Sequence, residues 1–174
     1  NGVDLERFRP LDRMAARRRL GWPRDRPVVL ASGQSGSPVK RLDVAQAAVD
    51  LARARMPGLE LRLLRGVPPD ETPYYLNAAD TVILTSQHEG SPNVVKEALA
   101  CNVAVVSVAV GDVRRWIGET PGCRLCDRKP EALAEALVKT ISAGGRSQGR
   151  EVVAEIDLPR IAQRVVGGYE RAIR

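Results

Sequence analysis

Aromatic residues are scarce in this sequence: they make up 3% of its 174 residues, although the net charge is +6. The positive charge comes from 23 Arg and only four Lys, scattered along the chain apart from the run Arg17-Arg18-Arg19. Nucleic-acid-binding modules gather positive charge on one face and use aromatic side chains to stack on bases. We therefore expect no nucleic-acid partner and interpret the arginines as a solvated surface. Attraction to anionic substrates or to a membrane surface is the alternative.

Long hydrophobic runs and a signal peptide are also absent. No apolar stretch approaches the roughly 20 residues of a membrane-spanning helix, and the first residues, Asn1 to Asp4, are neither basic nor apolar. The three cysteines are an odd number in a chain long enough to need no disulfides, so we expect a reducing cytoplasm. Because the sequence lacks an initiator Met, we expect it to be a piece of a longer polypeptide.

Short apolar runs alternate with segments of helical periodicity along the whole chain. Strands are predicted at 27–33, 59–66, 81–85, 103–108 and 123–126, and helices at 42–55, 71–78, 92–101, 130–142 and 158–173. Such alternation is typical of an α/β fold with a doubly wound, Rossmann-like parallel sheet. We expect a linker over 1–11, one domain over 12–157 and a C-terminal helix over 158–174.

Ligands of such sheets bind beyond the carboxyl ends of the strands, which directs attention to the loops 33–40, 86–92 and 108–113. The segment 86–98 leaves a strand and begins a helix, with Ser91 as the expected N-cap and Pro92 at the first helical position. Its free backbone N–H groups favour an anion. Glu89 and Glu97 would accept hydrogen bonds from hydroxyls. The combination suits a ligand with a central diphosphate and polyols at both ends.

The spacing Glu89-x7-Glu97, with its flanks Glu-Gly-Ser-Pro-Asn-Val-Val-Lys-Glu-Ala and the later Val110-Gly111-Asp112-Val113, resembles the group 1, or family 4, retaining glycosyltransferases of GT-B fold. The motif Asn-Gly-Val-Asp-x-x-x-Phe-x-Pro at 1–10 resembles the entry into that family's C-terminal domain. The resemblance covers nearly the whole chain and is greatest to enzymes of cell-surface polysaccharide or teichuronic acid assembly. It implies a domain that binds a nucleoside-diphosphate sugar, with an N-terminal acceptor domain as its partner.

The resemblance also implies a role for each matching residue. Glu97 would bind the ribose hydroxyls of the donor and Glu89 the transferred sugar, while Lys40 would offset the charge of the departing diphosphate. Glu89 and Lys40 are thus the candidate catalytic residues. The implied donor-binding set is Gly33, Gln34, Lys40, Glu89, Gly90, Ser91, Pro92, Asn93, Val94 and Glu97.

Two positions depart from the family pattern: Gln34 stands where Arg is frequent, and Ser91 where Phe is common. The base is expected at the turn Gly66-Val67-Pro68, read by backbone groups. The acceptor would be a saccharide or a lipid-linked molecule, which leaves open a peripheral location at the inner face of the membrane.

Several residues have simpler interpretations. His88, the only histidine, is interpreted as a surface residue. Asp112 either caps the next helix or contacts substrate. Cys123-x2-Cys126 with Cys101 falls short of the four ligands of a structural zinc site, so we expect no metal. No Asp-x-Asp motif is present, consistent with transfer that needs no divalent ion or other cofactor.

Two rival classes remain beside the transferase. A nicotinamide-binding domain would need Gly-x-Gly-x-x-Gly after the first strand and an acid closing the second strand. The chain has neither, since the second strand ends in Arg65-Gly66. A nucleotide-sugar-binding module without catalysis, or a GT-B glycosyl phosphorylase, is the alternative function.

Overall fold

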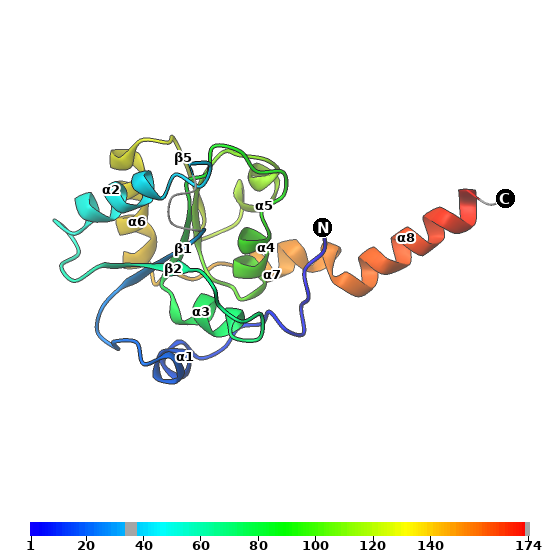
Figure 1. Cartoon of the computed structure of the whole chain (residues 1–174), viewed down its shortest axis with the longest axis horizontal. Coiled ribbons are helices and arrows are strands. Elements are labelled where there is room, and N and C mark those ends of the chain that lie inside the picture. The colour runs from blue at the N-terminus through cyan, green and yellow to red at the C-terminus, as the bar shows by residue number, and fades with distance from the viewer. Residues whose placement is uncertain (34–37, 173–174) are drawn as a thin grey trace.

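The computed structural model describes residues 1–33 and 38–172. Its sheet consists of five parallel strands in the order β2-β1-β3-β4-β5 (Figure 1). The strands are β1 (Val28–Ser32), β2 (Glu60–Leu64), β3 (Thr81–Leu84), β4 (Val105–Val108) and β5 (Arg124–Cys126). The register pairs Val28 with Glu60 and Val82 with Val105. Each predicted strand is therefore present, and the predicted doubly wound fold is confirmed.

Helices separate the strands and end the chain. They are α1 (Arg13–Leu20), α2 (Leu42–Ala52), α3 (Thr72–Ala78), α4 (Asn93–Ala100), α5 (Val113–Ile117), α6 (Pro130–Ser142), α7 (Gly149–Val153) and α8 (Leu158–Ala172), with a 3₁₀ turn, η1 (Ala154–Ile156). The five helices expected from periodicity are found; α1 and α7 were not predicted, and α5 was implied only by Asp112 as a candidate cap. No helix in the described ranges is both long and apolar enough to cross a membrane.

Alternate residues of the strands feed two separate cores. Val28 and Leu30 of β1 face a core completed by α1, α3, α4, α5 and α7. Val29 and Ala31 face the other core, completed by α2 and α6. This period of two, with both faces apolar, is what a parallel sheet covered by helices on both sides requires.

The run Arg17-Arg18-Arg19 is not wholly a solvated surface, so that part of the interpretation is wrong. Arg17 is only 2% exposed. Its guanidinium donates through Nη2 to Asp80 Oδ2 at 2.6 Å and through Nε to the carbonyl of Ala78 at 2.9 Å. A buried arginine of this kind is tolerated because its donors find acceptors.

The segment 1–11 packs on the domain. Val3 and Phe8 are buried, and the Val3 N–H donates to the carbonyl of Ile156 at 3.0 Å. Arg150 donates through Nη1 to the carbonyl of Phe8 at 2.7 Å and through Nη2 to that of Leu5 at 2.8 Å. These contacts hold the first residues against the surface of the domain. The domain boundaries given above remain predictions.

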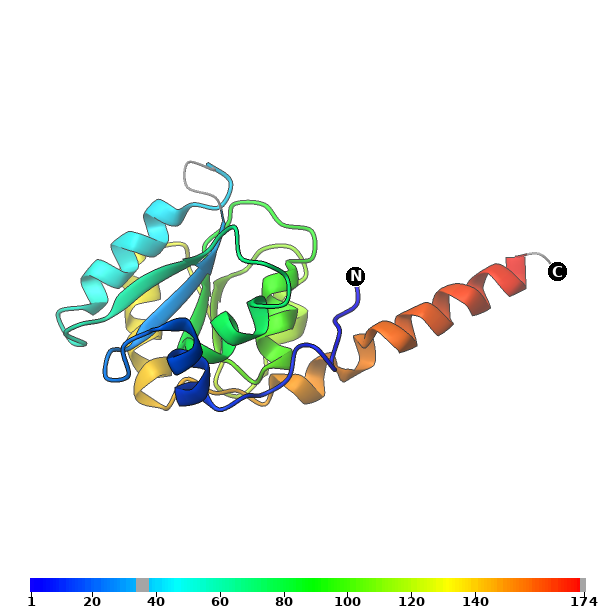
Figure 2. The ribbon, with the colours of Figure 1, turned by 60° about the horizontal axis from the view of Figure 1, so that its bottom comes forward.

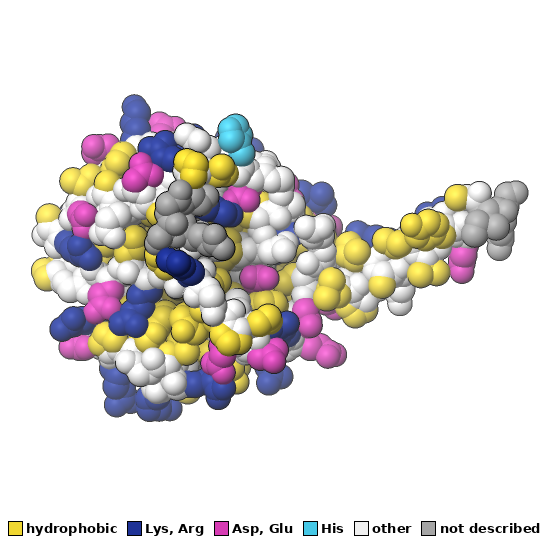
Figure 3. All heavy atoms as spheres, in the orientation of Figure 1, with side chains coloured by type: hydrophobic (Ala, Val, Ile, Leu, Met, Phe, Trp, Pro, Cys, Tyr) yellow, Lys and Arg dark blue, Asp and Glu magenta, His cyan; other side chains and the backbone are white. Residues whose placement is uncertain are grey.

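Helix α8 extends away from the body of the domain (Figures 1 and 2). No residue of its described length is buried, and Figure 3 shows hydrophobic side chains along it. Val165, Val166 and Tyr169 are 51%, 55% and 68% exposed. Ile173, the last position of the predicted apolar stripe, lies outside the described residues.

Candidate functional site

The three loops singled out from the sequence come together at the carboxyl end of the sheet. Strands β1 and β3 are neighbours there, and the chain turns to opposite sides after them, so this is the switch point of the sheet. The Gln87 N–H donates to the carbonyl of Val39 at 2.8 Å, and the Asp112 N–H donates to that of Gly90 at 3.1 Å. Backbone hydrogen bonds therefore connect the loop 86–92 to Val39 on one side and to the loop 108–113 on the other.

Lys40 and Glu89 form an ion pair between two of these loops. The Nζ of Lys40 donates to Glu89 Oε1 at 2.7 Å, and the two side chains are 31% and 14% exposed. The loop around Lys40 is held by Thr85, whose Oγ1 donates to the carbonyl of Lys40 at 3.0 Å. Gly33 has φ +152°, and a Cβ there would lie 3.1 Å from Lys40 Cγ. The glycine therefore leaves room for the lysine.

The amino end of α4 opens toward the same place. The helix begins at Asn93, with Pro92 as its N-cap and no side-chain capping hydrogen bond. The prediction of Ser91 as N-cap is therefore wrong by one residue. Among the described residues the backbone N–H groups of Asn93 and Val94 have no acceptor. Free amides at the positive end of a helix dipole attract an anion.

Ser91 instead belongs to a partly buried polar network. Its Oγ donates to Asp112 Oδ2 at 2.7 Å and accepts from Lys96 Nζ at 3.0 Å, and Lys96 also donates to the carbonyl of Asn1 at 3.0 Å. Asp112 is the N-cap residue of α5 but forms no capping hydrogen bond with its side chain. Asp112 therefore occupies the predicted cap position, but its carboxylate accepts from Ser91 and not from a backbone N–H of the helix.

Lys96 is the main residue of this site that the sequence reasoning missed. It is only 1% exposed, and burial lowers the pKa of its ammonium, while the nearby carboxylates of Asp112 and Glu97 oppose that shift. The available signal was a lysine in the first turn of a helix, where a cation is unfavourable. A buried lysine at such a position needs acceptors, and the loops supply them.

Glu97 lies between two hollows of the surface. The first, which we call the loop hollow, has a volume of about 350 Å³ and is lined by Ser32, Lys40, Leu64, Glu89, Ser91, Pro92, Asn93, Val94 and Glu97. The second, the linker hollow, has a volume of about 320 Å³ and is lined by Arg7, Phe8, Leu64, Gly66, Val67, Pro69, Thr72 and Glu97. Since both share Glu97 and Leu64, the two hollows adjoin at the carboxyl end of β2, and we call the pair the trough.

The carboxylate of Glu97 is available to accept hydrogen bonds from a ligand. Within the described part of the chain no donor hydrogen-bonds to it. Burial raises the pKa of its carboxyl group, against the opposing charges of Arg7 and Lys96. A half-buried carboxylate without donors is unfavourable by itself, so hydroxyl groups of a ligand would stabilise it.

Of the predicted donor-binding set, the trough collects Lys40, Glu89 and Glu97 with the residues of the α4 amino end. Gly33 lies behind Lys40. Gln34 lies outside the described residues. His88 is exposed, in agreement with its interpretation as a surface residue.

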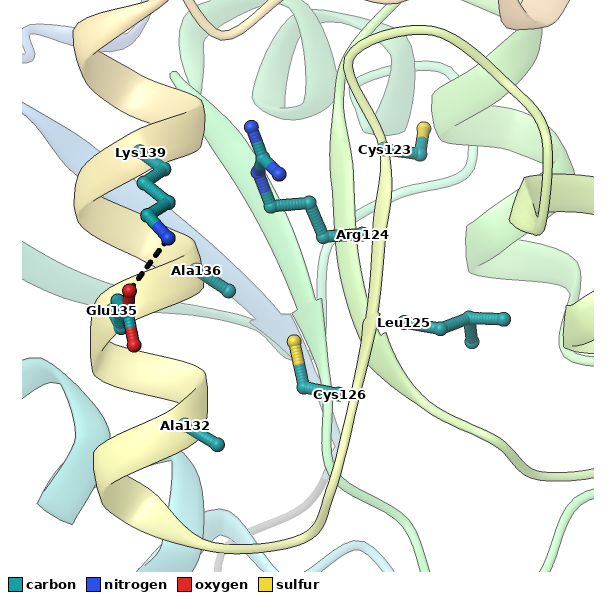
Figure 4. Close-up of a pocket in the computed structure, with 8 residues that line it drawn as sticks. All are labelled: Cys123, Arg124, Leu125, Cys126, Ala132, Glu135, Ala136 and Lys139. Atoms are coloured by element: carbon teal, nitrogen blue, oxygen red, sulfur yellow. Dashed lines mark ion pairs between the residues drawn. The ribbon is translucent and has the colours of Figure 1, made fainter.

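The cysteines do not converge. Cys123 packs on the core of α4 and α5, and Cys126 on that of α2 and α6, so the two thiols lie on opposite sides of β5 (Figure 4). In the described ranges no group of three or more His, Cys, Asp or Glu side chains is arranged to hold a metal ion. A further hollow of about 410 Å³ lies between β5 and α6. Its lining offers one surface ion pair, Lys139–Glu135, and it lies at the β5 edge of the sheet, not between β1 and β3.

A doubly wound parallel sheet with an open trough at its switch point defines a Rossmann-like α/β domain. Comparison with known proteins gives the family. The profile described as "Glycosyl transferases group 1" matches residues 49–143, which is more than half of the chain. The chain belongs to the group 1 glycosyltransferases.

Two curated relatives illustrate the range of that family. A D-inositol 3-phosphate glycosyltransferase of Saccharomonospora viridis is 33% identical over 79% of this chain, and the putative teichuronic acid biosynthesis glycosyltransferase TuaC of Bacillus subtilis is 29% identical over 79%. The matches span 40% and 39% of those proteins. The chain therefore spans well under half the length of these relatives.

Solved structures share the fold. Sucrose-phosphate synthase of Thermosynechococcus elongatus superposes on 99% of the chain with a TM-score of 0.83 at 25% identity, covering 51% of that protein. HepE of Anabaena, solved with UDP and glucose, gives 0.74 at 18% identity, over 98% of this chain and 55% of that protein. The C-terminal domain of the group 1 glycosyltransferase LpcC of Francisella tularensis gives 0.69 at 16% identity, over 94% and 98%. The fold is thus that of one half of a GT-B glycosyltransferase, and it matches a C-terminal domain.

Proposed function

We propose that the chain binds a nucleoside-diphosphate sugar and forms the donor half of a retaining hexosyltransferase. One observation carries the proposal: Lys40, the free amino end of α4 and the unpaired carboxylate of Glu97 line one trough at the switch point. The trough offers positive charge flanked by carboxylates, Glu89 on one side and Glu97 on the other. A diphosphate flanked by a sugar and a ribose has the complementary arrangement.

The diphosphate would lie against Lys40 and the N–H groups of Asn93 and Val94. Lys40 must then leave Glu89, to which it is bonded in the free chain. A partly exposed ion pair contributes roughly 0.2–1 kcal/mol, whereas a hydrogen bond to a charged group contributes about 1.5–3 kcal/mol. Exchanging the carboxylate for a phosphate is therefore inexpensive, and it releases Glu89 to accept from sugar hydroxyls.

In the reaction, the bond between the anomeric carbon and the diphosphate breaks and negative charge grows on the leaving phosphate. Lys40 and the α4 amides would stabilise that charge most strongly in the transition state. Glu89 would orient the sugar, and Glu97 would hold the ribose. The acceptor, a saccharide or lipid-linked molecule, would come from an N-terminal domain opposite the trough.

The exposed apolar side of α8 fits that division of labour. Beyond Ile161, which packs on the domain, α8 leaves Val165, Val166 and Tyr169 exposed among the described residues, and an apolar stripe of this kind is ordinarily covered. We propose that the N-terminal domain covers it. The likeness to TuaC, which is named for teichuronic acid biosynthesis, supports a role in polysaccharide assembly. We propose the cytoplasm, at the inner face of the membrane, as its setting.

Calorimetric titration of the chain with UDP, GDP, ADP and CDP tests donor binding. We expect at least one of these nucleotides to bind. The corresponding sugar nucleotide should bind more tightly, and Glu89→Ala should remove that additional affinity. A transfer assay on the chain and on a form joined to an N-terminal domain tests the division of labour. Turnover by the chain alone at the rate of the joined form, or no binding of any nucleotide, would overturn the proposal.

A further inference from the structure

The linker hollow contains a charged side chain that the proposed chemistry does not use. Arg7 comes from the segment 1–11, which was expected only to connect domains, yet it lines this hollow together with Glu97. Phe8, Val67 and Pro69 provide apolar walls. A planar, apolar ligand with polar edges suits such a hollow.

Arg7 has hydrogen-bonding capacity to spare. Its Nε and Nη2 atoms are buried and have no hydrogen-bond acceptor among the described residues. Nη2 lies 3.2 Å from Asp70 Oδ1 without hydrogen-bond geometry, and that carboxylate is 99% exposed, so water screens the pair strongly. The guanidinium also lies 5.6 Å from the Phe8 ring centre. Buried donors of this kind are stabilised when a ligand brings acceptors.

The order of groups along the trough decides which part of the ligand Arg7 meets. Lys40 and the α4 amino end occupy the loop hollow, and Glu97 stands at the junction. With the diphosphate in the loop hollow and the ribose at Glu97, the group beyond the ribose enters the linker hollow. That group is the nucleobase.

We propose that Arg7 determines the base specificity of the donor, donating to carbonyl oxygens of the base and so selecting uracil or guanine. The inference rests on the proposed function. A guanidinium has five donors and no acceptor. Uracil presents two carbonyl oxygens, and guanine presents O6 beside N7, a pair that arginine binds with both arms of its fork. Adenine and cytosine place an amino group at the corresponding edge, where two donors would face each other.

The test compares Arg7→Gln with Arg9→Gln in the whole 174-residue chain. Arg9 is exposed, lies two residues further along the same segment and does not line the hollow, so it is a matched loss of charge. Thermal denaturation without ligand first establishes that both variants fold. Calorimetry then measures UDP, GDP, ADP and CDP against each variant.

We expect the wild-type chain to bind UDP or GDP in preference to ADP and CDP. Arg7→Gln should weaken the preferred diphosphate about tenfold, the size of one hydrogen bond to a charged group, and leave ADP and CDP nearly unchanged. Arg9→Gln should behave as wild type. Arg7→Lys keeps the positive charge but loses the forked guanidinium. It should therefore retain less of the wild-type affinity for GDP than for UDP.

Equal weakening for all four bases would overturn the inference, because a structural role would act on every ligand alike. Unchanged affinities would overturn it as well. Both outcomes leave nucleotide binding itself intact and so differ from failure of the proposed function, in which the wild-type chain binds none of the four. Uridine or guanosine adds a second readout: Arg7→Gln should weaken the nucleoside, whereas Lys40→Ala should weaken only the diphosphate.

Discussion

At the amino end of the sheet Asp80 accepts from Arg13 Nη1 at 2.5 Å, Arg17 Nη2 at 2.6 Å and the Val28 N–H at 2.6 Å. At the carboxyl end the charges are equally crowded but incompletely paired. Glu97 receives no hydrogen bond within the described chain, and Asp112 Oδ1 is buried without a partner there.

Structural charges and functional charges of this fold therefore differ in how fully they are paired. A buried charge whose donors and acceptors are all used stabilises the folded chain and has nothing left for a ligand. A cluster with unused capacity is a less favourable arrangement, and persists where a ligand completes it.

The largest effect is expected at the amino end. Asp80→Ala leaves the guanidinium of Arg17 buried without its charged partner, which typically costs about 3–5 kcal/mol of unfolding free energy. Urea denaturation measures that loss, and the folded fraction should bind nucleotide as well as wild type. Asp43, whose carboxylate is 64% exposed in its pair with Arg41, provides the control: Asp43→Asn should cost less than about 1 kcal/mol.

The opposite result at Asp80 would contradict the structural role of this cluster. If Asp80→Ala kept its stability but lost nucleotide affinity, the fully paired cluster would be part of the binding machinery.

Lys40→Ala should show the reverse pattern. Its ion pair with Glu89 is partly exposed, so the unfolding free energy should change by less than about 1 kcal/mol. Affinity for a nucleoside diphosphate should fall roughly tenfold to a hundredfold, since one or two charged hydrogen bonds of about 1.5–3 kcal/mol disappear. Calorimetry and denaturation on the same preparation give both numbers. A loss of stability with affinity retained would assign Lys40 to the scaffold.

The strands could be predicted from the sequence more completely than the helices. Strands β1, β3 and β4 were predictable because a buried parallel strand is a short apolar run closed by a turn, as Val28–Ser32 shows. Helix α1, Arg13–Leu20, was not, since its sequence is dominated by arginine and one of its buried side chains is Arg17. Burial of Arg17 depends on Asp80, 63 residues away, and no local pattern records that pairing.

The site divides in the same manner. Lys40, Glu89 and the amino end of α4 follow strand ends, so topology alone predicted that they meet. Lys96 and Arg7 are placed by contacts with segments distant in sequence: Lys96 reaches the carbonyl of Asn1, and Arg7 reaches the hollow beside Glu97. Tertiary packing decides such positions, and helix or strand periodicity carries no signal for them.

The pH dependence of nucleotide affinity tests the role of Glu97 at the carboxyl end of the sheet. Burial raises the pKa of this carboxyl group, and a ribose hydroxyl donates best to its ionised form. Nucleotide affinity should therefore be full above the raised pKa and fall as the pH drops through it, at a higher pH than an ordinary glutamate would give. Glu97→Gln should lower the affinity about tenfold near neutral pH and remove this step.

Calorimetry across the acidic range is done with uridine, which has no phosphate and no base nitrogen that is protonated there. A pH step in its affinity then comes from the protein. A pH step that survives in Glu97→Gln would show that another group controls it.

Lys96 is the intermediate case, since it is buried as completely as Arg17 yet belongs to the carboxyl end. Lys96→Met keeps the length of the side chain and removes the cost of burying an ammonium, so the unfolding free energy should change little. Ser91 loses its bond from Lys96 Nζ and holds the head of α4 less firmly, so nucleotide affinity should fall several-fold. Lys129→Met, at an exposed lysine, is the control. If Lys96→Met instead binds as wild type and unfolds far more readily, Lys96 is a structural charge like Arg17, and unused pairing capacity at the carboxyl end is confined to the trough itself.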